Sequence, residues 1–302
     1  MTRVATGPMH YTMKTAMQTT QQRLANSLHQ LETQKKATDY AGIGIDTSRL
    51  LSAKSMLGRE DAYKTVASHV STTLEYYDTS LTAIDTQTEK LRKALLEVIG
   101  TGNGPGIQSN IEAAFDSLRA TLNTNSAGNA IFGGTQTETK PFVPQELGDM
   151  IGLDPADAFA NDTIKNSAQL ADGVNVEFGV VASDVAGNLV KAYRTLAEAG
   201  PFGDKPSAAQ LDAMKQALNE LEVGLKDVRS LNANNGAKQN QVETLSVRAG
   251  EREVMLKTVI GNAEDADLGQ VALDVANYQT LLASSYSVFS QISALSLANY
   301  LR

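Results

Sequence analysis

The stretch "ASHVSTTLEYYDTSLTAIDTQTEKLRKALLEV", residues 67–98, decides the fold of this chain of 302 residues. Its apolar and aromatic positions recur at alternating steps of three and four, with Thr88 as the one polar exception. Positions at this spacing share one face of an α-helix, and a sustained heptad repeat is typical of helices that pack along their length. Leu50, Ala53 and Leu57 continue the pattern upstream. The sequence therefore predicts a long helix over residues 46–99 that needs a partner along its length.

The glycine-rich segment "GTGNGPG", residues 100–106, is predicted to end this helix. Clustered glycine costs backbone entropy in a helix, and Pro105 lacks an amide donor. Apolar residues then resume the helical spacing, from Ile107 through Ile111 to Leu122. Residues 107–127 are therefore predicted to run back antiparallel to the first helix and to form a helical hairpin with it.

The same periodicity returns in the second half of the chain, over residues 211–228, 242–259 and 268–292. The polar stretch "NANNGAKQ", residues 232–239, interrupts it without a proline. This stretch is either a turn or a tolerated defect within one long helix, and we favour the continuous helix. With aromatics at only 5% of the chain and no Trp, the core is predicted to consist of Ala, Leu, Val and Ile.

Residues 141–206 have a different composition. The segment "GVNVEFGVV" alternates Val174, Val176, Phe178 and Val180 in the manner of a strand, and residues 185–196 indicate a short helix. The predicted fold class is therefore mainly α: a long antiparallel helical bundle made from the N- and C-terminal segments, with a small α+β middle domain. The predicted domains are an N-terminal assembly helix (1–45), a helical-bundle arm (46–140), the outer α+β domain (141–206), a returning bundle helix (207–265) and a C-terminal assembly helix (266–302).

Charge and composition exclude several classes of function. A net charge of -8 argues against nucleic acid as a partner, because such binding depends on neutralising phosphates. The absence of Cys excludes thiolate metal sites and a Cys nucleophile. The first residues, "MTRVATGPMHYTMK", lack the apolar region of a cleaved signal peptide. Residues 275–301 carry no charge, but their six serines favour a helix buried among protein helices over a membrane span.

Each candidate for catalytic chemistry has a simpler structural interpretation. His10, His29 and His69 lack the spacing of a zinc-binding helix. The 100–106 segment follows a helix instead of a strand and has no Lys-Ser/Thr pair, so it is a helix breaker and not a phosphate-binding loop. No GxSxG motif occurs. We therefore predict that the protein has no catalytic, metal-binding or cofactor-binding site, that it binds no cofactor and that it is not an enzyme.

The two ends of the chain carry apolar columns without an obvious partner nearby in the sequence. They are predicted to pair with each other and still to leave apolar surface exposed, which marks an interaction site. The alternative is that these residues form an ordinary core within one chain. The predicted assembly interface consists of Met17, Leu24, Leu28, Leu31, Leu268, Val271, Val275, Tyr278, Leu282, Phe289 and Ile292.

Three segments resemble the flagellin superfamily. "TTLEYYDTSLTAIDTQTEKLRKALLEVIGTGNG", residues 72–104, is similar to the end of the long bundle helix of that family, and residues 270–302 resemble its terminal assembly helix. "LRATLNTNSAGNAIFGGTQTETKPF", residues 118–142, resembles the place where the chain leaves the bundle for the outer domain. Its Phe-Gly-Gly turn and Pro-Phe pair are typical of the hook-filament junction proteins, whereas flagellins tend to carry Phe-Asn-Gly there. The predicted domain hinge consists of Gly128, Phe132, Gly133, Gly134 and Pro141.

The chain also departs from the family pattern. Where the family commonly has Ser-Gly-Lys followed by paired aspartates, this sequence has Thr33, Gln34 and Lys35, and then Asp39 and Tyr40. The ending "SLANYLR" is intermediate between the styles of the junction proteins and of the flagellins.

The resemblance implies a structural subunit of the bacterial flagellum that joins hook to filament and assembles through its terminal helices. It further implies an extracellular location reached by export without a cleaved signal peptide, and an export chaperone at the C-terminal helix. The implied partners are further copies of the chain in a tubular lattice and neighbouring hook-associated and flagellin subunits. Two alternatives stay open: a flagellin of the filament itself, and a surface binding or adhesion module with its site in residues 141–206.

Overall fold

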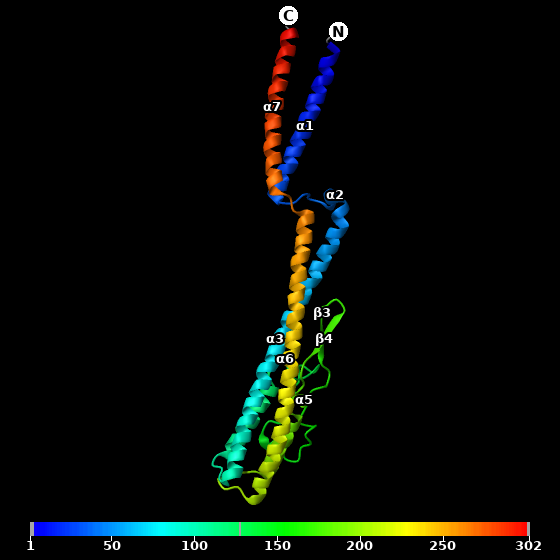
Figure 1. Cartoon of the computed structure of the whole chain (residues 1–302). Helices are drawn as coiled ribbons and strands as arrows, with labels where there is room; N and C mark the ends of the chain where they lie inside the picture. Colours follow the sequence, from blue (N-terminus) through cyan, green and yellow to red (C-terminus); the bar gives the residue numbers. More distant parts are fainter. Residues whose placement is uncertain (1–2, 127, 301–302) are drawn as a thin grey trace. The chain divides into compact units, whose positions relative to one another are not determined.

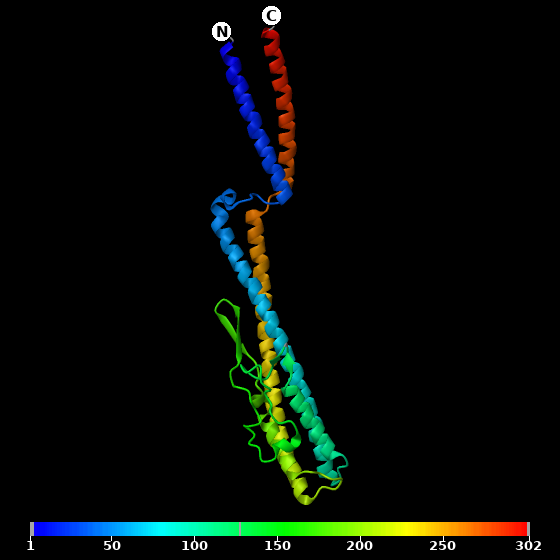
Figure 2. The same cartoon turned by 180° about the vertical axis from the view of Figure 1, so that it is seen from behind.

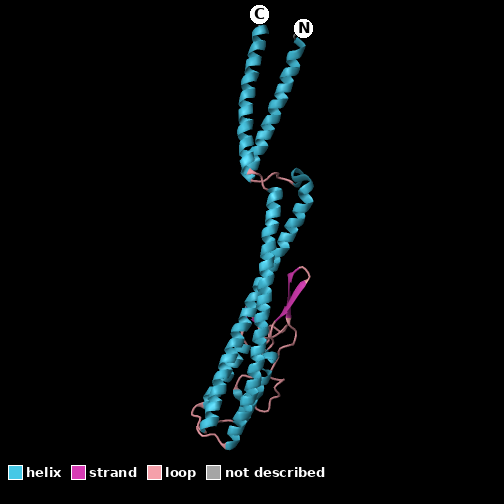
Figure 3. Cartoon of the chain, in the orientation of Figure 1, coloured by secondary structure: helices cyan, strands magenta, loops and turns pink. Residues whose placement is uncertain are grey.

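The computed structural model describes the backbone of residues 3–126 and 128–300, and the side chains of residues 8–126 and 128–292. Long helices dominate these residues, and the strands are confined to the middle of the chain (Figures 1 and 3). This confirms the predicted fold class. The helices and strands are α1 (Arg3–Thr33), α2 (Tyr40–Ile43), η1 (Gly44–Asp46), α3 (Thr47–Thr101), α4 (Ile107–Leu122), β1 (Asn125–Ser126), β2 (Asn129–Ala130), η2 (Leu147–Met150), β3 (Asn166–Ala171), β4 (Val174–Phe178), α5 (Ala182–Ala199), α6 (Ala208–Glu264) and α7 (Leu268–Tyr300).

The chain divides into two compact units. One comprises residues 60–251, and the other combines the two ends of the chain, up to residue 59 and from residue 252. Both α3 and α6 contribute residues to each unit. The division into five domains expected from the sequence stays a prediction.

Helices α3 and α6 form the bundle within residues 60–251 and run side by side in opposite directions (Figures 1 and 2). The heptad stripe of α3 is buried from Ala67 to Val98, and Thr88 is buried with it. Helix α6 passes through residues 232–239 without a break, which confirms the favoured interpretation of that stretch. Without a proline in it, each amide of the polar stretch can still make its helical hydrogen bond.

Helix α4 returns beside α3 after the glycine-rich turn, as predicted, but it ends at Leu122 and not at residue 127. The expected last turn is wrong because the side chain of Asn123 is engaged by a segment further along the chain. The side chain of Asn123 both donates to the carbonyl oxygen of Phe142 over 2.9 Å and accepts from its amide over 3.0 Å. The following residues form a short antiparallel ribbon, β1 with β2.

The middle domain contains a two-stranded antiparallel sheet, β3 with β4, followed by α5. The predicted strand and short helix are therefore confirmed, although Val180 lies just beyond the strand. Strand β4 ends because Gly179 has φ +114°, a conformation that favours glycine. Strand β3 was not predicted from the sequence, because its residues Asn166–Ala171 include no β-branched or aromatic side chain.

Aromatic side chains fill the core where the bundle meets the middle domain, which corrects the prediction of a purely aliphatic core. Phe115 of α4 lies 5.5 Å from the ring of Tyr193 on α5 and 5.8 Å from that of Phe142. The Phe142 ring in turn lies 5.7 Å from that of Phe159. Aromatic side chains bury a large apolar area each, and tilted or edge-to-face ring pairs of this kind add to the stability of the core.

In the described part of the chain, none of the helices combines the length and the apolar character that a membrane span requires.

Candidate assembly surfaces

The terminal helices α1 and α7 lie against each other, which confirms that the first and last segments pair. The ring of His10 meets the ring of Phe289 edge on, with 5.5 Å between their centroids. Further along the pair, the Nε2 of Gln21 donates to the hydroxyl oxygen of Tyr286 over 2.6 Å. These contacts join residues that are more than 260 positions apart in the sequence.

The predicted assembly residues of the two helices differ in burial. Val271 and Leu282 are buried. Leu28, Leu31 and Leu268 instead keep 41–44% of their surface exposed. The residues that are neither buried nor fully exposed are Met17, Leu24, Val275, Tyr278, Phe289 and Ile292. Whether any of them contacts a neighbouring subunit stays a prediction.

Helix α7 also has a second apolar face that the sequence analysis missed. Leu273, Leu281 and Val288 are 62%, 52% and 46% exposed. At 100° per residue they lie within about 80° of one another, and about 120° round the helix from the face that packs on α1. A search for one heptad column finds only one of two apolar faces. The lack of charge from residue 275 to residue 301 was the signal in the sequence that could have indicated a second face.

The two connections that lead into the terminal helices are joined by backbone hydrogen bonds. The amide of Lys36 donates to the carbonyl oxygen of Glu264 over 2.7 Å, and the amide of Ala266 donates to that of Gln34 over 3.0 Å. Lys35 and Asp265 thereby form a one-residue antiparallel bridge. Gln34 has φ +58°, which is uncommon for a residue other than glycine. The structure thus joins residues 34–36 to residues 264–266.

Side chains reinforce this junction. The carboxylate of Glu264 accepts from the ammonium groups of Lys54 and Lys35, the latter over 3.4 Å. Lys35 also contacts Asp265 over 2.6 Å. The hydrogen bond from Lys54, the nearby positive charge of Lys54 and the contacts from Lys35 lower the pKa of Glu264 against the opposing effect of burial. The carboxylate therefore stays ionised in its partly buried position.

Both terminal connections also carry an aspartate that accepts from the first amides of a helix. The Oδ1 of Asp39 accepts from the amide of Gly42 over 2.7 Å at the start of α2. The Oδ1 of Asp267 accepts from the amides of Gly269 and Gln270 over 3.0 and 3.2 Å at the start of α7. Such capping satisfies amides that have no partner within the helix.

The predicted domain hinge lies in the other unit, between α4 and the middle domain. Phe132 is fully buried, and its carbonyl oxygen accepts from the amide of Ala182 over 3.0 Å, which ties the connecting segment to the start of α5. Pro141 is buried as well, and its carbonyl oxygen accepts from the amide of Ala160 over 2.9 Å. These contacts are those of an ordered connection, and bending at this segment stays a prediction.

Two of the hinge glycines have backbone conformations with positive φ: Gly128 with +88° and Gly134 with +68°. A side chain at Gly134 would collide with the carboxylate of Asp162, which also accepts from the amide and the hydroxyl of Thr135. These hydrogen bonds from Thr135 lower the pKa of Asp162. Gly128 has open space around it. Glycine is therefore required at position 134 by packing as well as by backbone angle.

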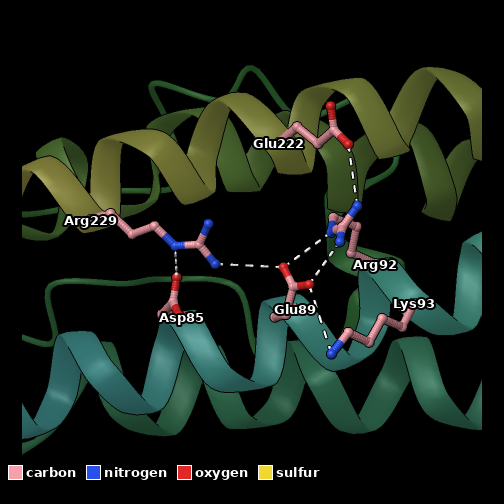
Figure 4. A network of polar contacts seen from close by, with 6 residues as sticks. All are labelled: Asp85, Glu89, Arg92, Lys93, Glu222 and Arg229. Atoms are coloured by element: carbon pink, nitrogen blue, oxygen red, sulfur yellow. Dashed lines mark hydrogen bonds and ion pairs between the residues drawn. The ribbon is translucent and has the colours of Figure 1, made fainter.

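A network of charged side chains joins α3 to α6 in the bundle (Figure 4). Arg92 binds Glu89 through two nitrogen atoms, over 3.0 and 2.7 Å, and reaches Glu222 of α6 over 3.3 Å. Arg229 of α6 donates to Asp85 over 2.6 Å and lies 3.6 Å from Glu89. Positive and negative side chains of α3 and α6 contact each other in turn along this network. These contacts favour one alignment of α3 with α6 along the helix axes.

Candidate ligand groups are sparse in the residues that the structure describes. Within residues 3–126 and 128–300, no group of three His, Asp or Glu side chains is arranged to hold a metal ion. His10 packs on an aromatic ring, and the Nδ1 of His29 lies 3.8 Å from an exposed carboxylate oxygen of Glu32.

These features are those of a structural protein: a helical bundle that carries a small middle domain, paired terminal helices, and an apolar face left exposed on one of them. No family model matches the chain. Flagellar hook-associated protein 3 of Salmonella typhimurium is 25% identical over a match of 235 residues, and the match covers 72% of this chain and 72% of that one. Flagellar hook-associated protein 3 of Escherichia coli is 24% identical over a match of 234 residues, which again covers 72% of each chain.

Among solved structures, flagellar hook associated protein-3 from Legionella pneumophila superposes with a TM-score of 0.58 at 10% identity. The superposition covers 70% of this chain and 97% of that one, and it demonstrates the shared fold. The predicted resemblance to the hook-associated branch of the flagellin superfamily, and to hook-associated protein 3 in particular, is confirmed by these matches. The relatives are flagellar structural proteins and not enzymes, which agrees with the predicted class.

Proposed function

We propose that this chain is a structural subunit of the bacterial flagellum that joins hook to filament, and that it assembles through α1 and α7. The observation that carries the proposal is the second apolar face of α7, formed by Leu273, Leu281 and Val288, which the single chain leaves exposed. The likeness to hook-associated protein 3 supports the same role.

The driving force for assembly is burial of this face. Each square ångström of apolar surface removed from water contributes about 25 cal/mol. Neighbouring subunits in a tubular lattice would cover Leu273, Leu281 and Val288 in the same way in every copy. Leu28, Leu31 and Leu268 would add to the buried surface, because they also stay exposed in the paired helices.

The remaining predicted assembly residues have a different part in this proposal. Val271, Leu282 and the half-buried residues around them hold α7 on α1, so that the two helices enter the lattice as a pair. The pairing lowers the conformational entropy that assembly would otherwise have to remove from two separate helices.

The proposal extends to partners and location. The partners are further copies of the chain and neighbouring hook-associated and flagellin subunits, and an export chaperone covers the apolar face of α7 before assembly. The chain is exported without a cleaved signal peptide and acts outside the cell. In the five-part division proposed from the sequence, residues 141–206 form an outer domain joined to the bundle through Gly128, Phe132, Gly133, Gly134 and Pro141.

Electron microscopy of the purified chain, alone and with isolated hooks, tests the proposal. We expect a thin cap on the hooks and no long polymers from the chain alone. Long filaments from the chain alone would instead indicate a filament flagellin. A chain that lacks residues 270–302 should keep a folded bundle, as measured by circular dichroism, and should leave the hooks bare. Normal capping by this truncated chain would refute assembly through α7.

A further inference from the structure

The junction between residues 34–36 and 264–266 suggests a role for one side chain in the proposed assembly. We propose that Glu264 is a positioning residue whose carboxylate fastens the two connections together, so that α1 and α7 are held as a pair before they meet the lattice. This inference rests on the proposed function for its purpose, although the fastening itself concerns the single chain.

Glu264 is at the centre of the junction. It is the last residue of α6, and its side chain is 13% exposed, against 43% for Lys35 and 39% for Lys54. Through Lys54 it binds α3, and through Lys35 it binds the connection that follows α1. Its carbonyl oxygen accepts from the amide of Lys36 in addition. One residue of α6 therefore contacts both α3 and the connection that follows α1.

The other contacts of the junction are weaker candidates for the same role. The ion pair of Lys35 with Asp265 is short, but the Asp265 side chain is 55% exposed. Water and salt screen charges at such a surface, so that exposed pairs contribute little. Lys36 donates from its Nζ to the carbonyl oxygen of Asn262 over 2.5 Å, a contact that involves no carboxylate. Glu264 combines an ionised group, two cationic partners and low exposure.

The short connections next to the junction explain why this fastening affects the terminal helices. Only three residues, 265–267, separate α6 from α7, and α1 ends at Thr33, one residue before the strained Gln34. A fixed junction therefore fixes the position of the end of α1 and of the start of α7. A loose junction leaves the α1–α7 pair held only by the packing between the two helices, because the 34–39 connection is long enough to move.

The variant Glu264→Gln tests this inference in the unassembled chain. It keeps the size of the side chain and removes the charge that holds Lys35 and Lys54. Hydrogen exchange at the amides of Lys36 and Ala266, which carry the backbone bonds of the junction, should become about tenfold faster. The matched control is Glu32→Gln, since the side chain of Glu32 is 82% exposed at the end of α1 and forms its one ion pair among the described residues with His29. It should leave both amides unchanged.

A second readout reports on the pairing of the helices at a distance. The chain has no Cys, so Gln21→Cys with Tyr286→Cys places the two thiols of the molecule on facing positions of α1 and α7. A short thiol-specific cross-linker should join them efficiently when Glu264 is present. With Glu264→Gln added, we expect the yield to fall several-fold, whereas a purely local role would leave it unchanged.

Unchanged exchange and unchanged cross-linking in Glu264→Gln would overturn the fastening role. Both measurements are made on the single chain, so they stand even if the unaltered chain fails to cap hooks, a result that would refute only the proposed function. If the unaltered chain caps hooks, the Glu264→Gln chain should cap them more slowly. Capping at the unaltered rate despite a loosened junction would overturn its role in assembly.

Discussion

The hydroxyl of Tyr77, on α3, donates to the carbonyl oxygen of Ile131 over 2.8 Å and so joins the bundle to the segment that leads into the middle domain. Tyr77 is buried, and its ring meets that of Phe132 edge on at 5.4 Å. Burial raises the pKa of the Tyr77 hydroxyl, which therefore stays protonated and able to donate. One side chain thus holds the connecting segment by both a hydrogen bond and a ring contact.

Replacing Tyr77 by Phe removes the hydroxyl and keeps the ring. The carbonyl of Ile131 loses its partner, and the free energy of unfolding should fall by about 1 kcal/mol, the usual net value of such a bond. Urea unfolding followed by circular dichroism measures the change. Tyr76→Phe is the matched control, because Tyr76 directly precedes Tyr77 in the sequence and is 46% exposed. Equal effects of the two substitutions would contradict the role of the buried hydroxyl.

Phe132→Ala should destabilise the chain far more than a substitution at the surface of the same compact unit. The fully buried ring leaves a cavity, which costs about 3–5 kcal/mol. Val143→Ala, at a residue that is 50% exposed, should change the free energy of unfolding by less than about 0.5 kcal/mol. Denaturant titrations of both variants provide the comparison. A small loss at Phe132 would mean that this segment is not part of the packed core.

The neighbours Leu281 and Leu282 separate the two faces of α7. Leu281 is 52% exposed and Leu282 is 8% exposed, so Leu282→Asp should break the α1–α7 pair. Leu281→Asp should keep the pair and abolish capping of hooks, because the charge would have to be buried between subunits. Hydrogen exchange of α7 measures the pairing, and electron microscopy with hooks measures the capping. Normal capping by Leu281→Asp would exclude this face from the interface.

The glycines of the connecting segment should differ in their tolerance of a side chain. Gly134→Ala places a methyl group against the Asp162 carboxylate at a positive φ and should cost more than 1 kcal/mol, roughly the penalty of the backbone angle alone. Gly128→Ala meets only that penalty, since the space around it is open. The two thermal midpoints give the order, and a greater loss for Gly128→Ala would contradict it.

The α3–α6 charge network should make stability depend on acid pH. The hydrogen bond from Arg92, followed by the charges of Arg92, Lys93 and Arg229, lowers the pKa of Glu89 in the folded chain. A lowered folded pKa means that the contribution of Glu89 is fully present above its unfolded pKa, about 4.3. It is then lost as the pH falls through the folded value.

Glu89→Gln isolates this contribution from those of the other carboxylates. Near pH 7 the variant should be less stable than the unaltered chain by up to about 1 kcal/mol, since Glu89 is partly exposed. The difference should shrink below pH 4.5 and vanish in stronger acid, as measured by unfolding at a series of pH values. A difference that stays constant down to pH 2.5 would show that the ionised carboxylate is not responsible.

Much of the architecture could be predicted because it depends on local periodicity. The heptad stripe of residues 67–98 specified α3, and the absence of a proline from residues 232–239 allowed the continuous α6. The end of α4 could not be predicted, because Asn123 stops the helix by bonding Phe142, which lies 19 residues away. Strand β3 was missed for a similar reason, since its partner β4, and not its own residues, makes it a strand.

The sequence by itself determined the helical bundle, the inserted middle domain, the pairing of the two ends and the resemblance to hook-associated proteins, because each follows from side-chain spacing within a segment. Tertiary structure alone decided which face of α7 is covered. Val271 and Leu282 pack on α1, whereas Leu273, Leu281 and Val288 stay exposed, and these two sets of apolar residues are alike in the sequence until a partner covers one of them. It likewise decided the importance of Glu264, an ordinary acidic residue in the sequence, whose lysine partners lie more than 200 positions away and are brought to it only by the fold.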